Sequence, residues 1–414
     1  DWQTRKDISK KVYFEWMPIR DASSNTIYRK ISYGSMLDLI MLDTRLEGRV
    51  KPPTNFDDVD VPARTMLGST QYNWFINNLK TSTAKWKVVG NQILFSDMNV
   101  GFGAVNSQGQ PAITDINAIR AVENLFIDNW ESYPTERNSI LDTIKNRNIK
   151  NTIFLTGDSH ASWSFDLTKK PANYPNAATA NLPTPSSSYT ASTGNGSVGI
   201  ELATPSITSA NFDEAIGKAT TAQFEYLINN PVTVGPPFGS VVYNPHLKYV
   251  DLDRHGYFIL DLKDDSAQAD YFYVDTLRIS SNKEKFGRGV VTANNSNRIT
   301  RLSSAASIGK SLQEGQAPAK PQPKATGVKE LKSTEAIIIG AYPVPTNSML
   351  NINYALNKSG ITEIAVFDVN GKKVETKRSC NIEEYYLLYP YFGGDETAPH
   401  RIKIKIAYSP NQKF

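Results

Sequence analysis

Asn151-Thr-Ile-Phe-Leu-Thr-Gly-Asp-Ser-His-Ala-Ser-Trp163 is the stretch around which the chain is organised. Residues 153–155 are apolar, β-branched and aromatic, which predicts a buried strand. Gly157 ends this strand, because a glycine lets the chain turn sharply without a Cβ clash. Asp158 and His160 follow two positions apart, and in an extended segment that spacing points both side chains to the same side. A carboxylate and an imidazole just past a buried strand occupy the place where open α/β sheets hold their chemistry.

Both side chains are ligands of first-row metals. The alternative is a turn aspartate that caps the next segment and a histidine packed beneath Trp163, since short motifs also match by chance. Cysteine and histidine are scarce: the chain has one cysteine, Cys380, and four histidines. A disulfide within the chain and a cysteine-based zinc site are therefore excluded. A metal site here must rely on oxygen ligands, which favours calcium or iron(III).

The composition is that of a folded protein rather than a disordered one. The 414 residues predict two to three domains, and 40% of them are hydrophobic against 21% charged. The net charge of +4 is carried by residues 301–334, so we expect no basic patch for nucleic acid. No run of 18 apolar residues exists, so we expect no membrane span. Because the chain starts at Asp1 without a signal peptide, we expect a processed product or an incomplete piece.

Strands and helices alternate along the first 300 residues, which predicts an α/β sheet with layers on its faces. Helices are expected at 1–20, 71–79, 116–126, 137–144 and within 212–235. Strands are expected at 36–42, 86–95, 153–155 and 199–209, followed by successive antiparallel strands at 249–253, 256–262 and 269–274. Residues 47–66 and the segment from 96 to Gln110 are expected to be loops, and 165–200 a long polar surface excursion. Glu201 is expected to be a structural carboxylate that bonds a backbone turn, and Asp128 and Trp130 to shape the mouth of a site.

Asp43-Thr44-Arg45 follows the strand at 36–42, at its carboxyl end. There the arginine can bind an anion, and the alternative is an internal pair between Asp43 and Arg45. His246, after Asn244-Pro245, is a second candidate for lining a site, with the orientation of a loop as its alternative.

A change in composition near residue 303 marks a linker. Ala, Ser, Gly, Lys, Gln and three prolines make residues 303–334 a solvated segment, between a domain at 1–302 and a final module at 335–414. The module is expected to have strands at 336–339, 350–354 and 361–367 and a hairpin turn at Asn370-Gly371.

Eight pieces in order across residues 1–300 resemble PhoD-like metallophosphatases. They are Leu42-Asp-Thr-Arg45, Arg64-Thr-Met-Leu-Gly68 with Gln71 and Trp74, Trp86-Lys-Val-Val-Gly-Asn-Gln92, Asp128-Asn-Trp-Glu-Ser-Tyr133 with Arg137, Thr156-Gly-Asp-Ser-His160, Glu201 with Pro205-Ser-Ile-Thr-Ser209, Asn244-Pro-His246 and Arg254-His-Gly-Tyr257. No single piece is decisive, but eight in the family's order form a specific signal.

The resemblance implies a metallophosphoesterase-like α/β/β/α sandwich, incomplete in this chain, that hydrolyses phosphate mono- or diesters with a metal-activated water. It implies calcium and iron as the metals, and Asp158 and His160 as two of their ligands. Arg45 and His246 complete the candidate catalytic residues. The family's earlier ligands, an aspartate, a Cys-x-Tyr element, Asp-Asp-His and Asn-Asp, should precede the first matching piece and are absent from this sequence. We therefore expect impaired activity in the chain as it stands.

The last 80 residues resemble a type IX secretion sorting domain. The matching residues are Tyr342-Pro-Val-Pro-Thr-Asn347, Leu350-Asn-Ile352 and Ile364-Ala-Val-Phe-Asp-Val-Asn-Gly-Lys-Lys-Val374, and the match weakens beyond about residue 376. The resemblance implies a small immunoglobulin-like β-sandwich, recognition by the type IX secretion machinery, and a secreted or cell-surface protein. The alternative is an ordinary terminal β-domain that only adds stability.

Two other functions remain open at this point. Gly157-Asp-Ser-His160 is also similar to the Gly-Asp-Ser block of GDSL serine esterases, in which Ser159 would be the nucleophile and would need a histidine base. The second alternative is a non-catalytic surface protein, in which an incomplete fold serves only as a carrier for the sorting domain.

Overall fold

The fold is taken from a computed structural model of the chain. It describes residues 1–17, 19, 26–55, 58–101, 116–173, 184–235, 239–279, 281 and 283–307, and the backbone of six strands beyond residue 307. Most of the predicted loop to Gln110, most of the linker, the Asn370-Gly371 turn, Cys380 and His400 lie outside the described residues. The chain forms two compact units, Asp1–Gln313 and Glu314–Phe414.

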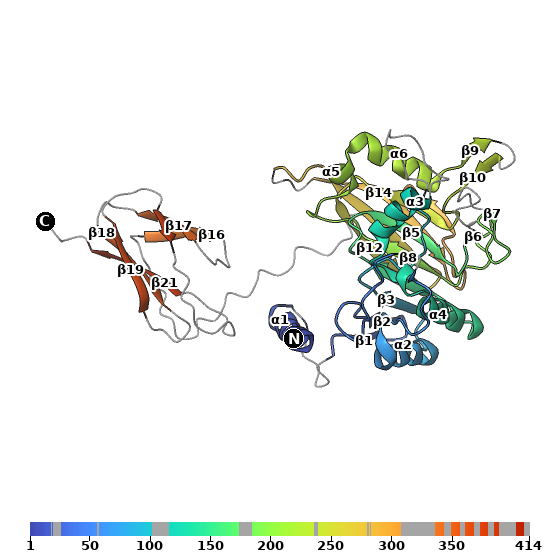
Figure 1. Cartoon of the computed structure of the whole chain (residues 1–414), viewed down its shortest axis with the longest axis horizontal. Coiled ribbons are helices and arrows are strands. Elements are labelled where there is room, and N and C mark those ends of the chain that lie inside the picture. Colours follow the sequence, from blue (N-terminus) through green and yellow to red (C-terminus); the bar gives the residue numbers. More distant parts are fainter. Residues whose placement is uncertain are drawn as a thin grey trace. The chain divides into compact units, whose positions relative to one another are not determined.

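A seven-stranded sheet is the centre of the first unit (Figure 1). In sheet order its strands are β1 (Arg29–Tyr33), β2 (Leu37–Met41), β3 (Trp86–Gly90), β4 (Thr152–Thr156), β8 (Gly199–Ala203), β5 (Ser162–Leu167) and β11 (Leu247–Asp251). The strands β2, β3, β4 and β8 are parallel, whereas β1, β5 and β11 run antiparallel to their neighbours. The carboxyl ends of four strands therefore meet at one edge, where parallel sheets hold their sites.

Helices cover one face of this sheet. The helices α2 (Gly68–Thr81) and α4 (Pro134–Asn146) lie side by side over β2, β3 and β4 (Figure 1). Their apolar residues Phe75 and Ile140 share a buried cluster with Val89 and Phe154 of the sheet. A strand that is buried on both faces is apolar along its whole length, which is the pattern that predicted β4.

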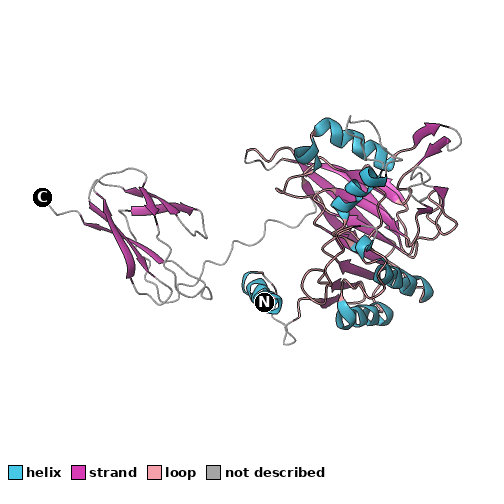
Figure 2. Ribbon diagram, in the orientation of Figure 1, coloured by secondary structure: helices cyan, strands magenta, loops and turns pink. Residues whose placement is uncertain are grey.

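A four-stranded antiparallel sheet covers the other face. Its strands are β12 (Gly256–Leu262), β13 (Ser266–Val274), β14 (Glu284–Ala293) and β15 (Arg301–Ser303). Tyr271 and Val290 of this sheet pack against Trp86, Ile153 and Ile200 of the first one. The helix, sheet and sheet layers make a mixed α/β fold, with helices at the outside of the strands (Figure 2). The prediction of an α/β sheet is confirmed at this level.

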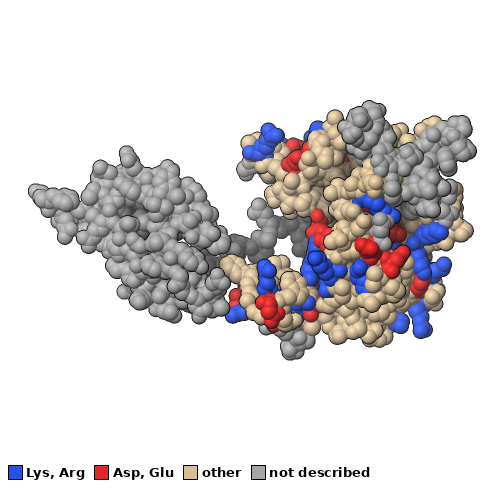
Figure 3. All heavy atoms as spheres, viewed as in Figure 1, with Lys and Arg blue, Asp and Glu red and all other residues tan. Residues whose placement is uncertain are grey.

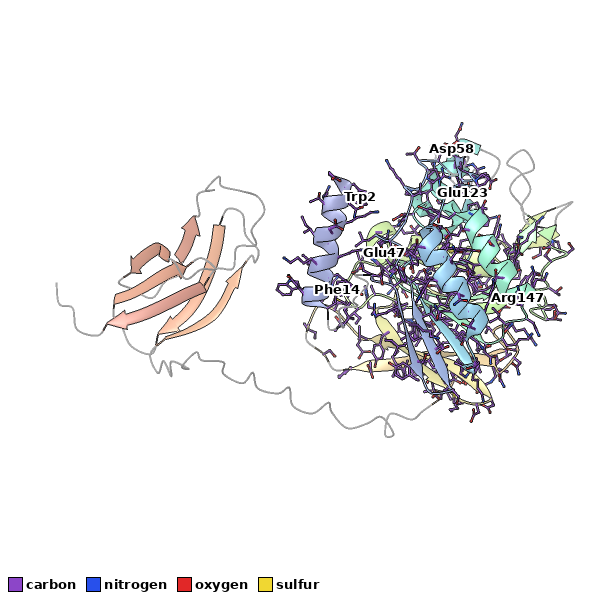
Figure 4. All side chains as sticks on the ribbon, turned by 90° about the horizontal axis from the view of Figure 1, so that it is seen from below. Trp2, Phe14, Glu47, Asp58, Glu123 and Arg147 are labelled. Carbon is purple, nitrogen blue, oxygen red and sulfur yellow. The ribbon has the colours of Figure 1, made fainter. Side chains whose placement is uncertain are left out.

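The remaining elements of the first unit are shorter or lie at its margin. They are α1 (Trp2–Trp16), α3 (Ile116–Glu123), α5 (Phe212–Ile216), α6 (Lys218–Asn229), the 3₁₀ turns η3 (Asn124–Phe126) and η4 (Trp130–Ser132), and the short strands β6 (Ala172–Asn173), β7 (Thr184–Pro185), β9 (Val232–Gly235) and β10 (Gly239–Val241). An ion pair of 2.6 Å between Lys10 and Glu47 ties α1 to the unit, and Figure 4 shows Glu47 on the side that faces α1.

Several of the sequence predictions for this unit were wrong. A surface segment was expected from residue 165 onward, but residues 165–167 belong to β5, and all six residues of this strand are buried. Its polar side chains are paired across the fold: Asp166 accepts hydrogen bonds from the Tyr189 hydroxyl (2.8 Å) and the Ile299 amide (2.7 Å). The strand expected to reach Phe95 ends at Gly90, and β11 pairs with β5 in the large sheet instead of with β12. Sequence also gave no signal for β14 and β15.

The second unit consists of two three-stranded sheets among its described residues. One has the order β16 (Ala336–Tyr342), β17 (Met349–Leu356) and β20 (Tyr385–Leu388), and the other β19 (Lys373–Ser379), β18 (Ile361–Phe367) and β21 (Lys403–Ser409). Strands were predicted within β16, β17 and β18, and these are confirmed. The immunoglobulin-like arrangement of the module stays a prediction.

Charges of both signs are interspersed over the described part of the face in Figure 3, with no area of one sign alone. None of the described helices combines the length and the apolar character that a membrane crossing requires.

Candidate functional site

The candidate site lies at the edge where the parallel strands end. Asp43 follows β2, Gln92 follows β3, Asp158 follows β4 and Ser206 follows β8. Because these four strands are parallel neighbours, residues that are far apart in sequence lie at the same edge of the sheet.

The turn after β2 is held by its own aspartate. The Asp43 carboxylate accepts hydrogen bonds from the backbone amides of Arg45 (3.1 Å), Leu46 (3.0 Å) and Glu47. The Gln92 side chain accepts from the Thr44 amide (2.9 Å), which joins this turn to the end of β3. The turn is therefore fixed on both sides, and it presents the Arg45 side chain outward.

Arg45 bridges two carboxylates from distant parts of the chain. Its guanidinium lies 2.8 Å from Asp128 and 2.8 Å from Asp158, while Arg49 pairs with the other oxygen of Asp128. Burial lowers the pKa of Arg45, but these bonds outweigh it and leave the pKa raised. Burial likewise raises the pKa of Asp128, and the bonds from both arginines outweigh it and lower the pKa. Asp43 accepts a hydrogen bond from the backbone amide of Arg45 and not from its side chain. The guanidinium of Arg45 therefore pairs with Asp128 and Asp158 instead of with Asp43.

The segment from Asp158 to His160 is not extended, so the sequence argument for its side-chain directions was wrong. Asp158 has φ 66° and His160 has φ 60°, both in the left-handed region. Residues 157–161 carry the chain from β4 past β8 to β5, which forces this tight path. Asp and His are among the residues that tolerate positive φ, and such strained backbone gathers at functional sites.

His160 has one ring nitrogen fixed and the other available. Its Nδ1 lies 2.6 Å from the backbone oxygen of Ala210, and the His160 carbonyl accepts from the Ser206 amide at 2.9 Å. Since a carbonyl oxygen only accepts, Nδ1 is the donor in this bond, and Nε2 is the ring nitrogen left for another partner. This is the arrangement that orients a metal-binding imidazole. The His160 side chain is exposed, so Nε2 is open to a ligand.

A pocket of about 200 Å³ adjoins Asp158. Its lining residues are Ile93, Leu94, Leu125, Phe126, Asp128, Asn129, Asp158, Ser159, Trp163 and Phe212. The wall is thus mainly apolar, with two carboxylates among its polar groups. The fully buried Trp163 contributes an indole N–H that has no hydrogen-bond partner among the described residues.

Glu201 lies under this edge as a structural carboxylate, as the sequence predicted. It accepts hydrogen bonds from the Phe95 and Ser96 amides, both at 2.8 Å, and from the Thr156 hydroxyl at 2.6 Å. Burial raises the pKa of Glu201 despite these bonds. Glu201 therefore fastens the end of β4 to the segment that follows β3.

His246 lies in the interior instead. It is 1% exposed, its Nε2 donates to the Asp97 carbonyl oxygen at 2.8 Å, and its ring packs on Phe165. Burial lowers the pKa of His246 to about 3, so the imidazole is neutral at physiological pH. His246 is not among the residues that line the pocket beside Asp158.

The serine alternative lacks its base within the described residues. The Ser159 hydroxyl bonds the Ala161 carbonyl oxygen at 3.4 Å. The late histidine that this alternative would use, His255, has its Nδ1 2.9 Å from the hydroxyl of Ser206 instead.

A metal centre is only partly supplied by the residues in view. Asp158 and His160 have the donor chemistry for it, but across the described ranges no three His, Cys, Asp or Glu side chains gather as a metal site. The described residues therefore offer two ligands and do not hold a metal by themselves. Arg49 is the site residue that sequence missed, because nothing in the loop 47–66 distinguishes it.

Comparison with known proteins gives two family matches. Residues 1–271 match the family described as PhoD-like phosphatase, and residues 340–386 match the secretion system C-terminal sorting domain. Alkaline phosphatase D of Bacillus subtilis (strain 168) is 34% identical over 176 residues, which are 39% of this chain and 27% of that protein. A solved structure titled "Structure of PhoD" is 25% identical with a TM-score of 0.51, and the match covers 74% of this chain and 50% of that one. The chain thus spans half or less of the length of these relatives.

Proposed function

Because the chain belongs to the family of PhoD-like phosphatases, we propose that it hydrolyses phosphate esters at the edge that holds Arg45, Asp158 and His160. The observation that supports this most is the position of Asp158: it follows β4, bonds Arg45 at 2.8 Å and lines a pocket. Phosphate mono- and diesters are the proposed substrates, with the organic group of the ester in the apolar pocket.

PhoD-like phosphatases depend on metals, and we propose calcium and iron for this chain. A bound metal polarises the phosphoryl oxygens and lowers the pKa of a bound water. Asp158 and the free Nε2 of His160 would be two of the ligands. Arg45 has five N–H donors, and its two bonds to carboxylates leave donors for a phosphoryl oxygen. His246 we assign to positioning, since its neutral ring supports the backbone at Asp97.

The sorting domain indicates export to the cell surface or to the medium. We propose the type IX secretion machinery as the partner that recognises it. We also propose domain limits of 1–302, 303–334 and 335–414. The three observed layers of the first unit would be part of the α/β/β/α sandwich of metallophosphoesterases, and the second unit would be immunoglobulin-like.

Hydrolysis of bis(p-nitrophenyl) phosphate and p-nitrophenyl phosphate by the full chain is the test. Activity is measured after chelation and after addition of calcium, iron(III) or both. Asp158→Asn and His160→Gln should each lower kcat/KM by about tenfold or more. Asp142→Asn is the matched control, because this half-exposed aspartate of α4 pairs with Lys169 and not with Arg45, Asp158 or His160.

Two results would contradict the proposal. Equal rates for the wild type and Asp158→Asn would remove Asp158 from the chemistry. Absence of hydrolysis under every metal condition, together with less than about one bound metal per chain, would favour the non-catalytic surface protein.

A further inference from the structure

A second polar pocket lies at the opposite edge of the seven-stranded sheet, where β2, β3 and β4 begin. Its volume is about 490 Å³. Its lining residues are Ser35, Met36, Thr83, Ala84, Lys85, Lys87, Lys150, Asn151, Asp264, Asn294 and Asn295. β4 runs between this pocket and Asp158, a distance of about 16 Å for five extended residues. The pocket is therefore separate from the candidate hydrolytic site.

Lys87 is an unpaired cation in the wall of this pocket. It interrupts the otherwise apolar strand β3, and it is only 9% exposed. Among the described residues no carboxylate or other acceptor bonds its ammonium group. Asp38 is its neighbour across the register with β2, but Ser32 (2.5 Å), Ser82 (2.6 Å) and Lys30 (3.3 Å) already bond that carboxylate.

The electrostatics of Lys87 reflect this lack of a counter-ion. Burial lowers its pKa, and the opposing effect of Asp38 does not make up for it. A buried ammonium group is stable in a folded protein when an anion or several acceptors face it. The side open to an anion here is the pocket.

The rest of the wall adds positive charge and amide groups. Lys85 and Lys150 also line the pocket, and Asp264 pairs with Lys85. The three lysines and one aspartate leave the pocket with a net charge of +2. Asn294 and Asn295 contribute carboxamides to the same wall.

Asn151 holds this wall in place. Its side-chain amide donates to the Asn294 side chain (2.7 Å) and to the Lys85 carbonyl oxygen (3.0 Å), and its side-chain oxygen accepts from the Asn295 amide (2.6 Å). The wall is therefore fixed before any ligand arrives, which lowers the entropic cost of binding.

We propose that this pocket binds a small multivalent oxyanion, in its simplest form a phosphate group, with Lys87 as the central cation. Tetrahedral oxyanions accept hydrogen bonds in several directions, and lysines and carboxamides around a concave wall can donate them. The proposed binding site is independent of the proposed hydrolytic activity, because the two lie at opposite ends of the strands. It gives a role to the lysine of Trp86-Lys-Val-Val, which the candidate chemistry leaves unused.

Binding of inorganic phosphate to the full chain, measured by isothermal titration calorimetry in chelator, tests the proposal. Lys87→Met keeps the aliphatic length and removes the charge, and it should weaken phosphate binding about tenfold or more. Lys169→Met is the control, because that lysine is half-exposed and pairs with Asp142 away from the pocket. It should bind phosphate like the wild type.

Two further variants make the result decisive. Arg45→Leu alters the hydrolytic edge, and phosphate binding that persists in it but is weakened in Lys87→Met supports the pocket. Lys150→Met changes a lysine at the rim and should also weaken binding, which covers the case in which Lys87→Met fails to fold.

A final arm separates free phosphate from a phosphorylated sugar. Glucose 6-phosphate replaces inorganic phosphate in the same titrations, and tighter binding of it would indicate a sugar-bound phosphate group. Equal binding of inorganic phosphate to the wild type, Lys87→Met and Lys150→Met would overturn the proposal, as would an absence of binding to the wild type.

Discussion

Lowering the pH should destabilise the first unit through His246. The ring is 1% exposed and its pKa is about 3 in the folded chain, against 6.5 for an unperturbed histidine. Between these values the unfolded chain binds a proton that the folded chain rejects. The stabilisation from a neutral His246 is therefore present above about pH 6.5 and is lost progressively as the pH falls towards 3.

The magnitude follows from the two pKa values. At about pH 5 protonation stabilises the unfolded state by RT ln(1 + 10^1.5), which is about 2 kcal/mol. At about pH 7.5 the same quantity is below about 0.1 kcal/mol. Buried acids act in the opposite direction. Burial raises the pKa of Asp97 and of Glu131, so protonation of these two carboxyl groups stabilises the folded state as the pH falls. A variant without the imidazole is therefore needed to isolate the histidine.

His246→Gln removes the titrating ring and keeps an amide donor for the Asp97 carbonyl oxygen. The assay is urea unfolding followed by tryptophan fluorescence, and all six tryptophans belong to the first unit, so the second unit is silent. Between about pH 7.5 and 5 the wild type should lose about 2 kcal/mol more than His246→Gln. Equal losses would refute a buried neutral ring. A hydrolysis rate that titrates with His246 near its ordinary pKa would place it back in the chemistry.

Three other substitutions test the site and its support. Arg45→Leu should change the free energy of unfolding by less than about 1 kcal/mol, because its ion pairs are half-exposed, yet it should lower kcat/KM for the nitrophenyl esters about tenfold. Glu201→Gln should cost about 1–3 kcal/mol in urea unfolding, because one side-chain oxygen becomes a donor facing amides that need an acceptor. Gly256→Ala should cost more than about 2 kcal/mol or prevent soluble expression, since a Cβ would lie 1.9 Å from the Phe272 carbonyl oxygen.

The elements that sequence predicted are those in which apolar residues mark the buried positions. β4 is apolar on both faces because helices cover one and a sheet covers the other. In α2, Phe75 and Leu79 recur at the helical spacing and both are buried. In such segments the local pattern of apolar residues reflects which positions are buried in the fold, so a short stretch of sequence is sufficient to predict the element.

β5 was not predicted, because its polar residues are satisfied by partners that a window does not contain. Ser164 bonds the Tyr271 hydroxyl at 3.2 Å, and Asp166 bonds the Ile299 amide, both more than 100 residues away. A buried polar residue costs stability unless it is paired, and the pairing appears only in the folded chain. The serines and the aspartate of β5 therefore led to a prediction of surface exposure, whereas these residues are buried.

The candidate site shows the same division. Sequence placed Arg45 and Asp158 at the ends of strands, and the parallel register brings those ends together. It did not indicate that the two would bond each other, or that Asp128 would join them, because these contacts span 113 and 83 residues. The positive φ values of Asp158 and His160 were likewise hidden, since they follow from the path between β4 and β5.

The charge balance of the site gives a physical reason for a metal. Asp128 and Asp158 carry two negative charges, and Arg45 and Arg49 carry two positive ones, so these four side chains together are neutral. A phosphate ester brings further negative charge beside these two carboxylates. We propose that the family's metals bring the additional positive charge that such a substrate needs. The pocket around Lys87 has the opposite balance, because its lining side chains carry a net positive charge, which is the charge that the proposed binding of an oxyanion requires.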